Sequence, residues 1–73
     1  MIFPNPSKGI FTLQSENENI VAVEIQNSLG EVVFQDVVNL GQATLNLNNQ
    51  SKGIYFLTFK TDSGIFVEKI ILQ

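Results

Sequence analysis

The chain has 73 residues, no cysteine and no histidine, and its four basic and seven acidic side chains give a net charge of −3. This length predicts one small domain, which buries only about 60% of its unfolded surface. Without cysteine, neither disulfides nor thiolate metal sites can support the fold. A mildly acidic chain without clustered cations is a poor match for nucleic acid or an anionic membrane. No apolar run approaches the roughly 20 residues that a transmembrane helix needs.

The chain opens with a segment that can be neither helix nor central strand. Pro4 and Pro6 flank Asn5, and each proline fixes φ, lacks an N–H donor and biases the residue before it toward extended backbone. Gly9 and the alternating residues 10–13 follow directly. We therefore expect an ordered lead into a first strand over residues 10–13.

Alternation of apolar and polar residues with a period of two continues along the chain, and no helical stripe interrupts it. Val21, Val23 and Ile25 are expected to share one face of a strand over residues 21–26. The turn that follows ends at Gly30, where a positive φ is expected. Strands over residues 31–38 and 43–47 come next, with a turn over residues 39–42 between them.

The last two predicted strands cover residues 54–61 and 65–72. Gly53 stands where the chain must turn into the strand over residues 54–61. This strand has the clearest alternation of apolar and polar residues, with Tyr55, Leu57 and Phe59 on one face. Four side chains from earlier strands are expected in the same core: Phe11, Leu13, Val23 and Ile25. Both faces of these last strands carry apolar residues, so we expect one face to be partly exposed.

Short strands at intervals of about ten residues are typical of an antiparallel β-sandwich. The predicted fold is therefore a small all-β, immunoglobulin-like sandwich of six to seven strands. Its chain ends inside an apolar strand, which is typical of a terminal module of a longer protein.

The sequence predicts neither an enzyme nor a cofactor site. Histidine and cysteine, the commonest general bases and thiol nucleophiles, are missing. The side chains of residues 16–19, or of Asn46, Asn48 and Asn49, could offer oxygen ligands to calcium, but neither group has the spacing of a calcium loop. Such segments more often cap turns. Tyr55 is expected to be a core residue with its hydroxyl at the rim, in preference to a platform for sugar stacking.

Taken in order, these segments resemble the type A C-terminal sorting domain of type IX secretion substrates in Bacteroidetes. The motifs that carry the resemblance are Phe3-Pro4-Asn5-Pro6 with Gly9, the strand and turn that end at Gly30, Leu45-Asn46-Leu47, Gly53-Ile54-Tyr55 and Lys69-Ile70-Ile71-Leu72. Together they cover essentially the whole chain.

The resemblance implies a folded C-terminal signal that directs a cargo protein across the outer membrane through the type IX secretion system. Residues 1–73 would then be one sorting domain of a larger secreted protein, with the cargo on its N-terminal side. The implied partners are the outer-membrane translocon, its shuttle proteins and a sortase-like peptidase that removes the domain after export. The implied route runs through the periplasm to the cell surface or extracellular space of a Gram-negative bacterium. An immunoglobulin-like accessory or carbohydrate-binding module of a secreted enzyme stays open as the alternative, and so does a structural spacer.

The family motif divides into residues expected to be mainly structural and residues expected to be recognised. The structural set is Pro4, Asn5, Pro6, Gly9, Gly30, Gly53 and Tyr55. The candidate recognition set is Lys69, Ile70, Ile71 and Leu72. Glu68 and Lys69 interrupt an apolar run, which is how edge strands are protected from uncontrolled pairing, and a protected but available strand suits β-augmentation. The alternative is that Ile70 and Leu72 simply complete the sandwich.

Overall fold

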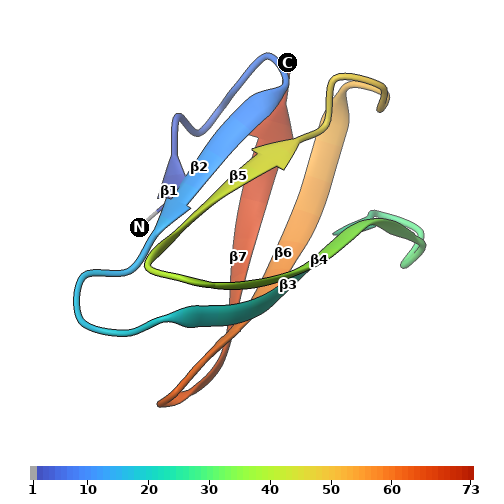
Figure 1. Cartoon of the computed structure of the whole chain (residues 1–73). Helices are drawn as coiled ribbons and strands as arrows, with labels where there is room; N and C mark the ends of the chain where they lie inside the picture. The colour runs from blue at the N-terminus through green and yellow to red at the C-terminus, as the bar shows by residue number, and fades with distance from the viewer. Residues whose placement is uncertain (1) are drawn as a thin grey trace.

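Seven strands, all paired antiparallel, make up the fold in the computed structural model, which describes residues 2–73 (Figure 1). The expected domain begins at Met1, which lies outside the described residues. The strands are β1 (Ile2–Phe3), β2 (Ile10–Gln14), β3 (Ile20–Asn27), β4 (Val32–Leu40), β5 (Gln42–Asn46), β6 (Gly53–Thr61) and β7 (Gly64–Leu72). The prediction of a small all-β sandwich is confirmed. Among residues 2–73 there is no helix that could span a membrane.

The strands form two sheets, one with the order β1-β2-β5 and one with the order β4-β3-β6-β7. The second sheet places β4 beside β3, in the position that an extra strand takes in immunoglobulin variable domains. The immunoglobulin-like description rests on this strand order and on one tyrosine contact, which is described below. In the four-stranded sheet, one face packs on the three-stranded sheet, and we call the opposite face the outer face.

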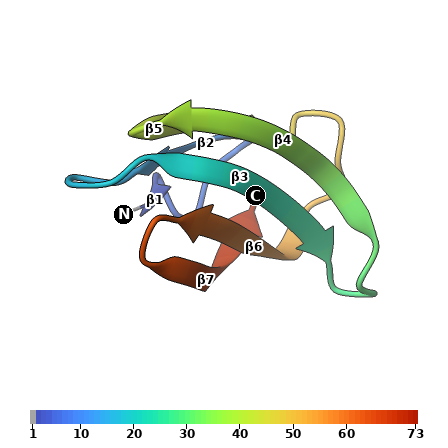
Figure 2. The ribbon, with the colours of Figure 1, turned by 60° about the horizontal axis from the view of Figure 1, so that its bottom comes forward.

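Between β4 and β5 the chain passes from one sheet to the other within a single residue, Gly41, which corrects the expected turn over residues 39–42. β4 continues to Leu40 and β5 begins at Gln42, and Figure 2 shows the two as one curved ribbon. The pairing of β3 with β4 shifts between Ile20 and Ala22, and Asn39 has a φ of 58°. A bulge bends a strand and raises its twist, so this irregularity replaces the turn with a corner.

A second bulge corrects the expected face of Val21. Ile20 pairs with Thr61 and Ala22 pairs with Lys60, so Val21 is an extra residue in β3. An extra residue reverses the alternation of side chains at that point. As a result Ile20 is buried beside Val23 and Ile25, whereas Val21 is only half-buried.

The core lies between the two sheets and contains the side chains that alternation predicts. Tyr55 and Leu57 are buried, and Phe59 is half-buried and packs against the same cluster. The buried apolar residues are Phe11, Leu13, Ile20, Val23, Ile25, Ala43, Leu45, Leu47, Tyr55, Leu57, Ile70 and Leu72. The predicted shared core of β2, β3 and β6 is therefore confirmed.

Candidate functional site

β7, which contains the candidate recognition residues, is an edge strand that pairs only with β6 within its sheet. Its side chains alternate between the core and the outer face. Ile70 and Leu72 are buried in the core, whereas Lys69 is exposed and Ile71 is 38% exposed. Two of the four candidate residues therefore hold the strand in the sandwich, and two are accessible to a partner.

Residues 4–7, which we call the proline strap, run along the free edge of β7. The side-chain Nδ2 of Asn5 donates to the carbonyl of Lys69 at 3.0 Å, and the N–H of Ile71 donates to Oδ1 of Asn5 at 3.1 Å. The Asn5 amide thus makes the two bonds that a backbone peptide group of a neighbouring strand would make. Both prolines of the strap follow cis peptide bonds.

Backbone pairing continues the strap beyond Asn5. The N–H of Ser7 donates to the carbonyl of Ile71 at 3.0 Å, and the N–H of Gln73 donates to the carbonyl of Ser7 at 2.8 Å. These two bonds form a parallel bridge between Ser7 and Leu72. The strap therefore covers the edge of β7 from Lys69 to the end of the chain.

Ser7 and Gly9 attach the other end of the strap to the three-stranded sheet. The Ser7 hydroxyl donates to the carbonyl of Ile10 at 2.6 Å and accepts from the N–H of Gly9 at 3.2 Å. The carbonyl of Gly9 accepts from the N–H of Leu47 at 2.7 Å. A Cβ on Gly9 would lie 1.8 Å from Oδ1 of Asn48, so a side chain at this position requires Asn48 to move.

Three further motif residues lie at or near the ends of strands: Gly30 precedes β4, and Gly53 and Tyr55 begin β6 opposite Leu72 and Ile70 of β7. Gly30 has a φ of 84°, so the positive φ expected there is confirmed, and Gly53, where the chain was expected to turn, has a φ of 149°. The Tyr55 side chain is buried, and its hydroxyl donates to the carbonyl of Ser51, as expected for a hydroxyl at the rim. A tyrosine near the start of a strand that bonds a carbonyl a few residues upstream is also a feature of immunoglobulin-type domains.

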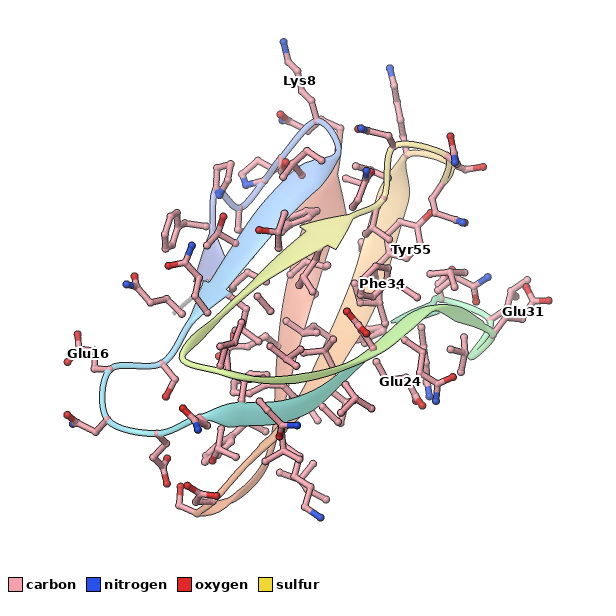
Figure 3. The ribbon with its side chains drawn as sticks, viewed as in Figure 1. Lys8, Glu16, Glu24, Glu31, Phe34 and Tyr55 are labelled. Carbon is pink, nitrogen blue, oxygen red and sulfur yellow. The ribbon has the colours of Figure 1, made fainter. Side chains whose placement is uncertain are left out.

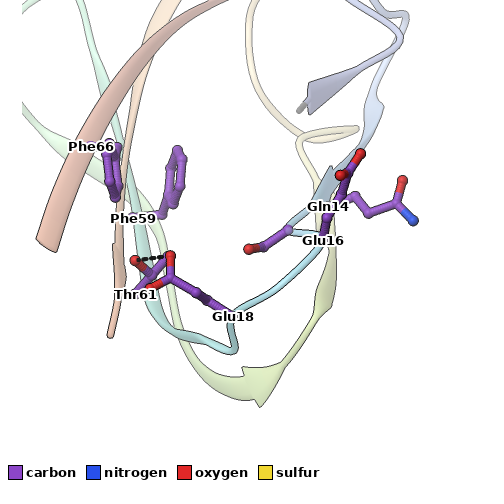
Figure 4. A pocket seen from close by; sticks show the side chains of 7 residues that line it. Gln14, Glu16, Glu18, Phe59, Thr61 and Phe66 are labelled. Atoms are coloured by element: carbon purple, nitrogen blue, oxygen red, sulfur yellow. Dashed lines mark hydrogen bonds between the residues drawn. The ribbon is translucent and has the colours of Figure 1, made fainter. Parts of the chain in front are cut away.

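A hollow of about 320 Å³ lies between the β2–β3 loop and the β6–β7 hairpin (Figure 4). The rings of Phe59 and Phe66 stack at its side, with their centroids 5.5 Å apart. The Glu18 carboxylate accepts hydrogen bonds from the hydroxyls of Thr61 at 3.2 Å and Ser63 at 2.8 Å. These bonds tie the loop to the hairpin and use the carboxylate structurally.

Two other residues considered as calcium ligands, Asn46 and Glu16, do not belong to a metal site either. Oδ1 of Asn46 accepts from the N–H of Asn48, which is a turn-capping bond. Figure 3 shows Lys8, Glu16 and Glu31 projecting from three separate parts of the molecule. Within residues 2–73, no three acidic side chains gather into a group that could hold a metal ion.

The outer face of the four-stranded sheet carries many accessible apolar side chains, which confirms that one face of the last strands is partly exposed. Ile54 pairs with Ile71, and Thr58 pairs with Val67, on this face. The exposed apolar residues on it include Val37, Ile54, Phe56, Ile65, Val67 and Ile71.

Sequence reasoning missed the contact between Asn5 and β7. Asparagine between two prolines was a usable signal, because its amide offers a donor and an acceptor where the neighbouring residues have no N–H. The pairing itself joins positions more than 60 residues apart, which a local pattern does not reveal.

The comparisons with known proteins agree with this architecture. No curated protein matched the sequence. Residues 1–73, the whole chain, match the family described as secretion system C-terminal sorting domain. The resemblance inferred from the motifs is thereby confirmed, and an accessory or carbohydrate-binding module is not favoured. The family is one of sorting signals and not of enzymes. The chain belongs to the secretion system C-terminal sorting domains, the signals for export across the outer membrane by type IX secretion.

Proposed function

We propose that the secretion machinery recognises this domain at the end of β7, over residues 69–72. The observation that carries the proposal is the division of these residues in the structure. Lys69 and Ile71 are exposed on the outer face, which also carries exposed apolar side chains. Ile70 and Leu72 are buried. The exposed pair is the part that a partner contacts, and the buried pair fixes its position.

The partners in this proposal are the outer-membrane translocon and the shuttle proteins that work with it. Residues 1–73 are one sorting domain of a larger secreted protein, and the cargo precedes it in the same chain. A sortase-like peptidase removes the domain after export. The route runs through the periplasm to the surface or surroundings of a Gram-negative bacterium.

The test is a fusion of the domain to a foreign cargo, such as a fluorescent protein, expressed in a cell with a type IX system. Ile71→Asp places a charge in the proposed contact, and Val37→Asp places the same charge on β4, at another exposed position of the outer face. Truncation after Glu68 is unsuitable, because it also removes the buried Ile70 and Leu72.

We expect the unmodified fusion to be exported, Ile71→Asp to lower export at least tenfold, and Val37→Asp to leave export within about twofold of normal. Resistance of the purified domain to protease measures folding separately. Equal export of both variants, or loss of export by Ile71→Asp only together with loss of folding, contradicts recognition at this site.

A further inference from the structure

The edge of β7 is covered over only part of its length. Asn5 and Ser7 occupy the backbone groups from the carbonyl of Lys69 onward. Backbone groups of alternate residues in a strand point to the same side, so Ile65 and Val67 direct theirs toward the same edge. Residues 2–73 supply no strand on that side of Ile65 and Val67. The open part of the edge therefore continues directly into the covered part.

Residues 4–6 of the strap are held more weakly than the strand that they cover, and Ser7 at its end is buried. Pro4, Asn5 and Pro6 are exposed, and both hydrogen bonds of the Asn5 side chain lie at the surface. Water can replace such bonds, so their net contribution is small. β7, by contrast, pairs with β6 along its whole length and buries Ile70 and Leu72. The strap can therefore leave the edge while β7 stays in place.

While the strap is in place it also ends the sheet. Pro4 and Pro6 have no N–H, so the far side of the strap offers few donors to a further strand. Prolines and short segments on an edge are known means of preventing uncontrolled pairing. Once the strap leaves, a nine-residue edge from Gly64 to Leu72 becomes available.

We propose that the proline strap is a displaceable cover, and that an extended segment of a partner protein replaces it as an added strand on β7. The strap itself shows which groups can pair with the edge, because the side-chain amide of Asn5 and the backbone of Ser7 form hydrogen bonds with β7. This inference rests on the proposed function, since the partner is a component of the secretion machinery. Unlike the recognition of side chains proposed above, it assigns the main-chain edge of β7 as the binding surface.

The side chains beside the edge indicate the chemistry of the partner segment. Ile65 and Val67 are 67% and 63% exposed on the outer face, and Lys69 follows them on the same face. Neighbouring side chains on one face of a sheet contact each other across strands. The matching segment therefore has apolar residues at two alternate positions and an acidic residue at the next alternate position.

A disulfide between the strap and β7 tests whether the strap must leave. The chain has no cysteine of its own. Ser7 and Leu72 are bridge partners. Paired residues in neighbouring strands have Cα atoms about 5 Å apart, which is a suitable distance for a disulfide. The double variant Ser7→Cys with Leu72→Cys locks the strap. The two single variants carry the same substitutions without the lock and serve as controls.

We expect the unmodified fusion to be exported, and the locked variant to be exported at least tenfold less than either single variant, each of which carries one of its two substitutions. Equal export of the locked and single variants overturns the displacement of the strap and leaves the proposed function intact. Absence of export of the unmodified fusion overturns the proposed function itself.

Amide hydrogen exchange on the isolated domain gives a second test, which does not depend on how well Leu72→Cys folds. In the unmodified domain, the N–H of Ile71, bonded to Asn5, should exchange at least tenfold faster than that of Ile70, which faces β6. Asn5→Ala should speed exchange at Ile71 further, and Asn49→Ala, the same change at an exposed loop residue, should not. Equal exchange at Ile70 and Ile71 in the unmodified domain means that the strap leaves only when the whole fold opens, which overturns the inference.

Discussion

Asn5 shows how one side chain can substitute for a peptide group at the edge of a sheet. Its neighbours Pro4 and Pro6 cannot donate, yet the edge of β7 at this point needs both a donor for the Lys69 carbonyl and an acceptor for the Ile71 N–H. A side-chain amide supplies both, and a carboxylate supplies only the acceptor. The Pro-Asn-Pro sequence thus covers an edge without creating a new one.

At Tyr55 the hydroxyl fixes the connection that leads into β6. Tyr55→Phe keeps the ring in the core and removes the donor to the Ser51 carbonyl, so we expect a loss of about 1 kcal/mol in the free energy of unfolding. Ser51→Ala changes the side chain of the acceptor residue and keeps its carbonyl, so it should change stability little. Urea unfolding of both variants checks this. An equal loss in both would show that the hydroxyl bond is not the cause.

Gly30 ends the turn between β3 and β4 with a φ of 84°. No atom lies within 4 Å of the place where a Cβ would stand, so the cost of Gly30→Ala comes from the backbone alone, and we expect it to be about 1–2 kcal/mol. Asparagine tolerates a positive φ better than alanine, so Gly30→Asn should lose less. Thermal unfolding distinguishes the two, and equal stability of all three proteins would contradict the argument.

Within β6, alternation places adjacent residues in opposite environments. Leu57 is fully buried, whereas Phe56 is 40% exposed on the outer face. Leu57→Ala should cost about 2–5 kcal/mol, because it removes buried methyl groups and leaves a cavity. Phe56→Ala removes a larger side chain but leaves no cavity in the core, so we expect a cost below about 1.5 kcal/mol. Denaturant unfolding measures both, and a larger loss in Phe56→Ala would mean that the outer face is packed in solution.

The strands and their faces could be predicted from the sequence because they depend on local alternation. The run from Ile54 to Thr61 matches β6 within one residue, and its inward residues are those that alternation selects. The sequence did not predict the bulge at Val21 or the corner at Gly41, because both depend on pairing with distant strands. It also did not predict β1, which is only two residues long and exists through its pairing with β2.

The position of the candidate recognition residues in the last strand could be predicted for the same reason, and their role in recognition stays a prediction. Alternation and the family motif identified residues 69–72, but they did not show that Asn5 and Ser7 cover the edge there. That contact joins the two ends of the chain, and only the folded arrangement brings them together.

In the whole molecule, one crossing of the chain lies over each open side of the sandwich. On one side β4 turns into β5 at Gly41, and on the other the proline strap leads from β1 across the edge of β7 to β2 (Figure 1). A domain of this size has little stability to spare, about 3–5 kcal/mol from its core. The two crossings therefore matter to the fold, and the second one also lies on the surface proposed for recognition.

If the signal is the folded surface of β7, export must follow folding across the whole domain. Leu57 is fully buried in the core, whereas the proposed contacts Lys69 and Ile71 are exposed on the outer face, so Leu57→Ala should lower export in proportion to the fraction of unfolded domain. Leu57→Met nearly conserves side-chain volume and should cost less than about 1.5 kcal/mol, so it should be exported normally. Export of a cargo fusion and protease resistance, each measured over a range of temperatures, give the two quantities to compare. Normal export of an unfolded Leu57→Ala domain would show that the machinery reads the linear sequence of the last strand and not the sandwich that presents it.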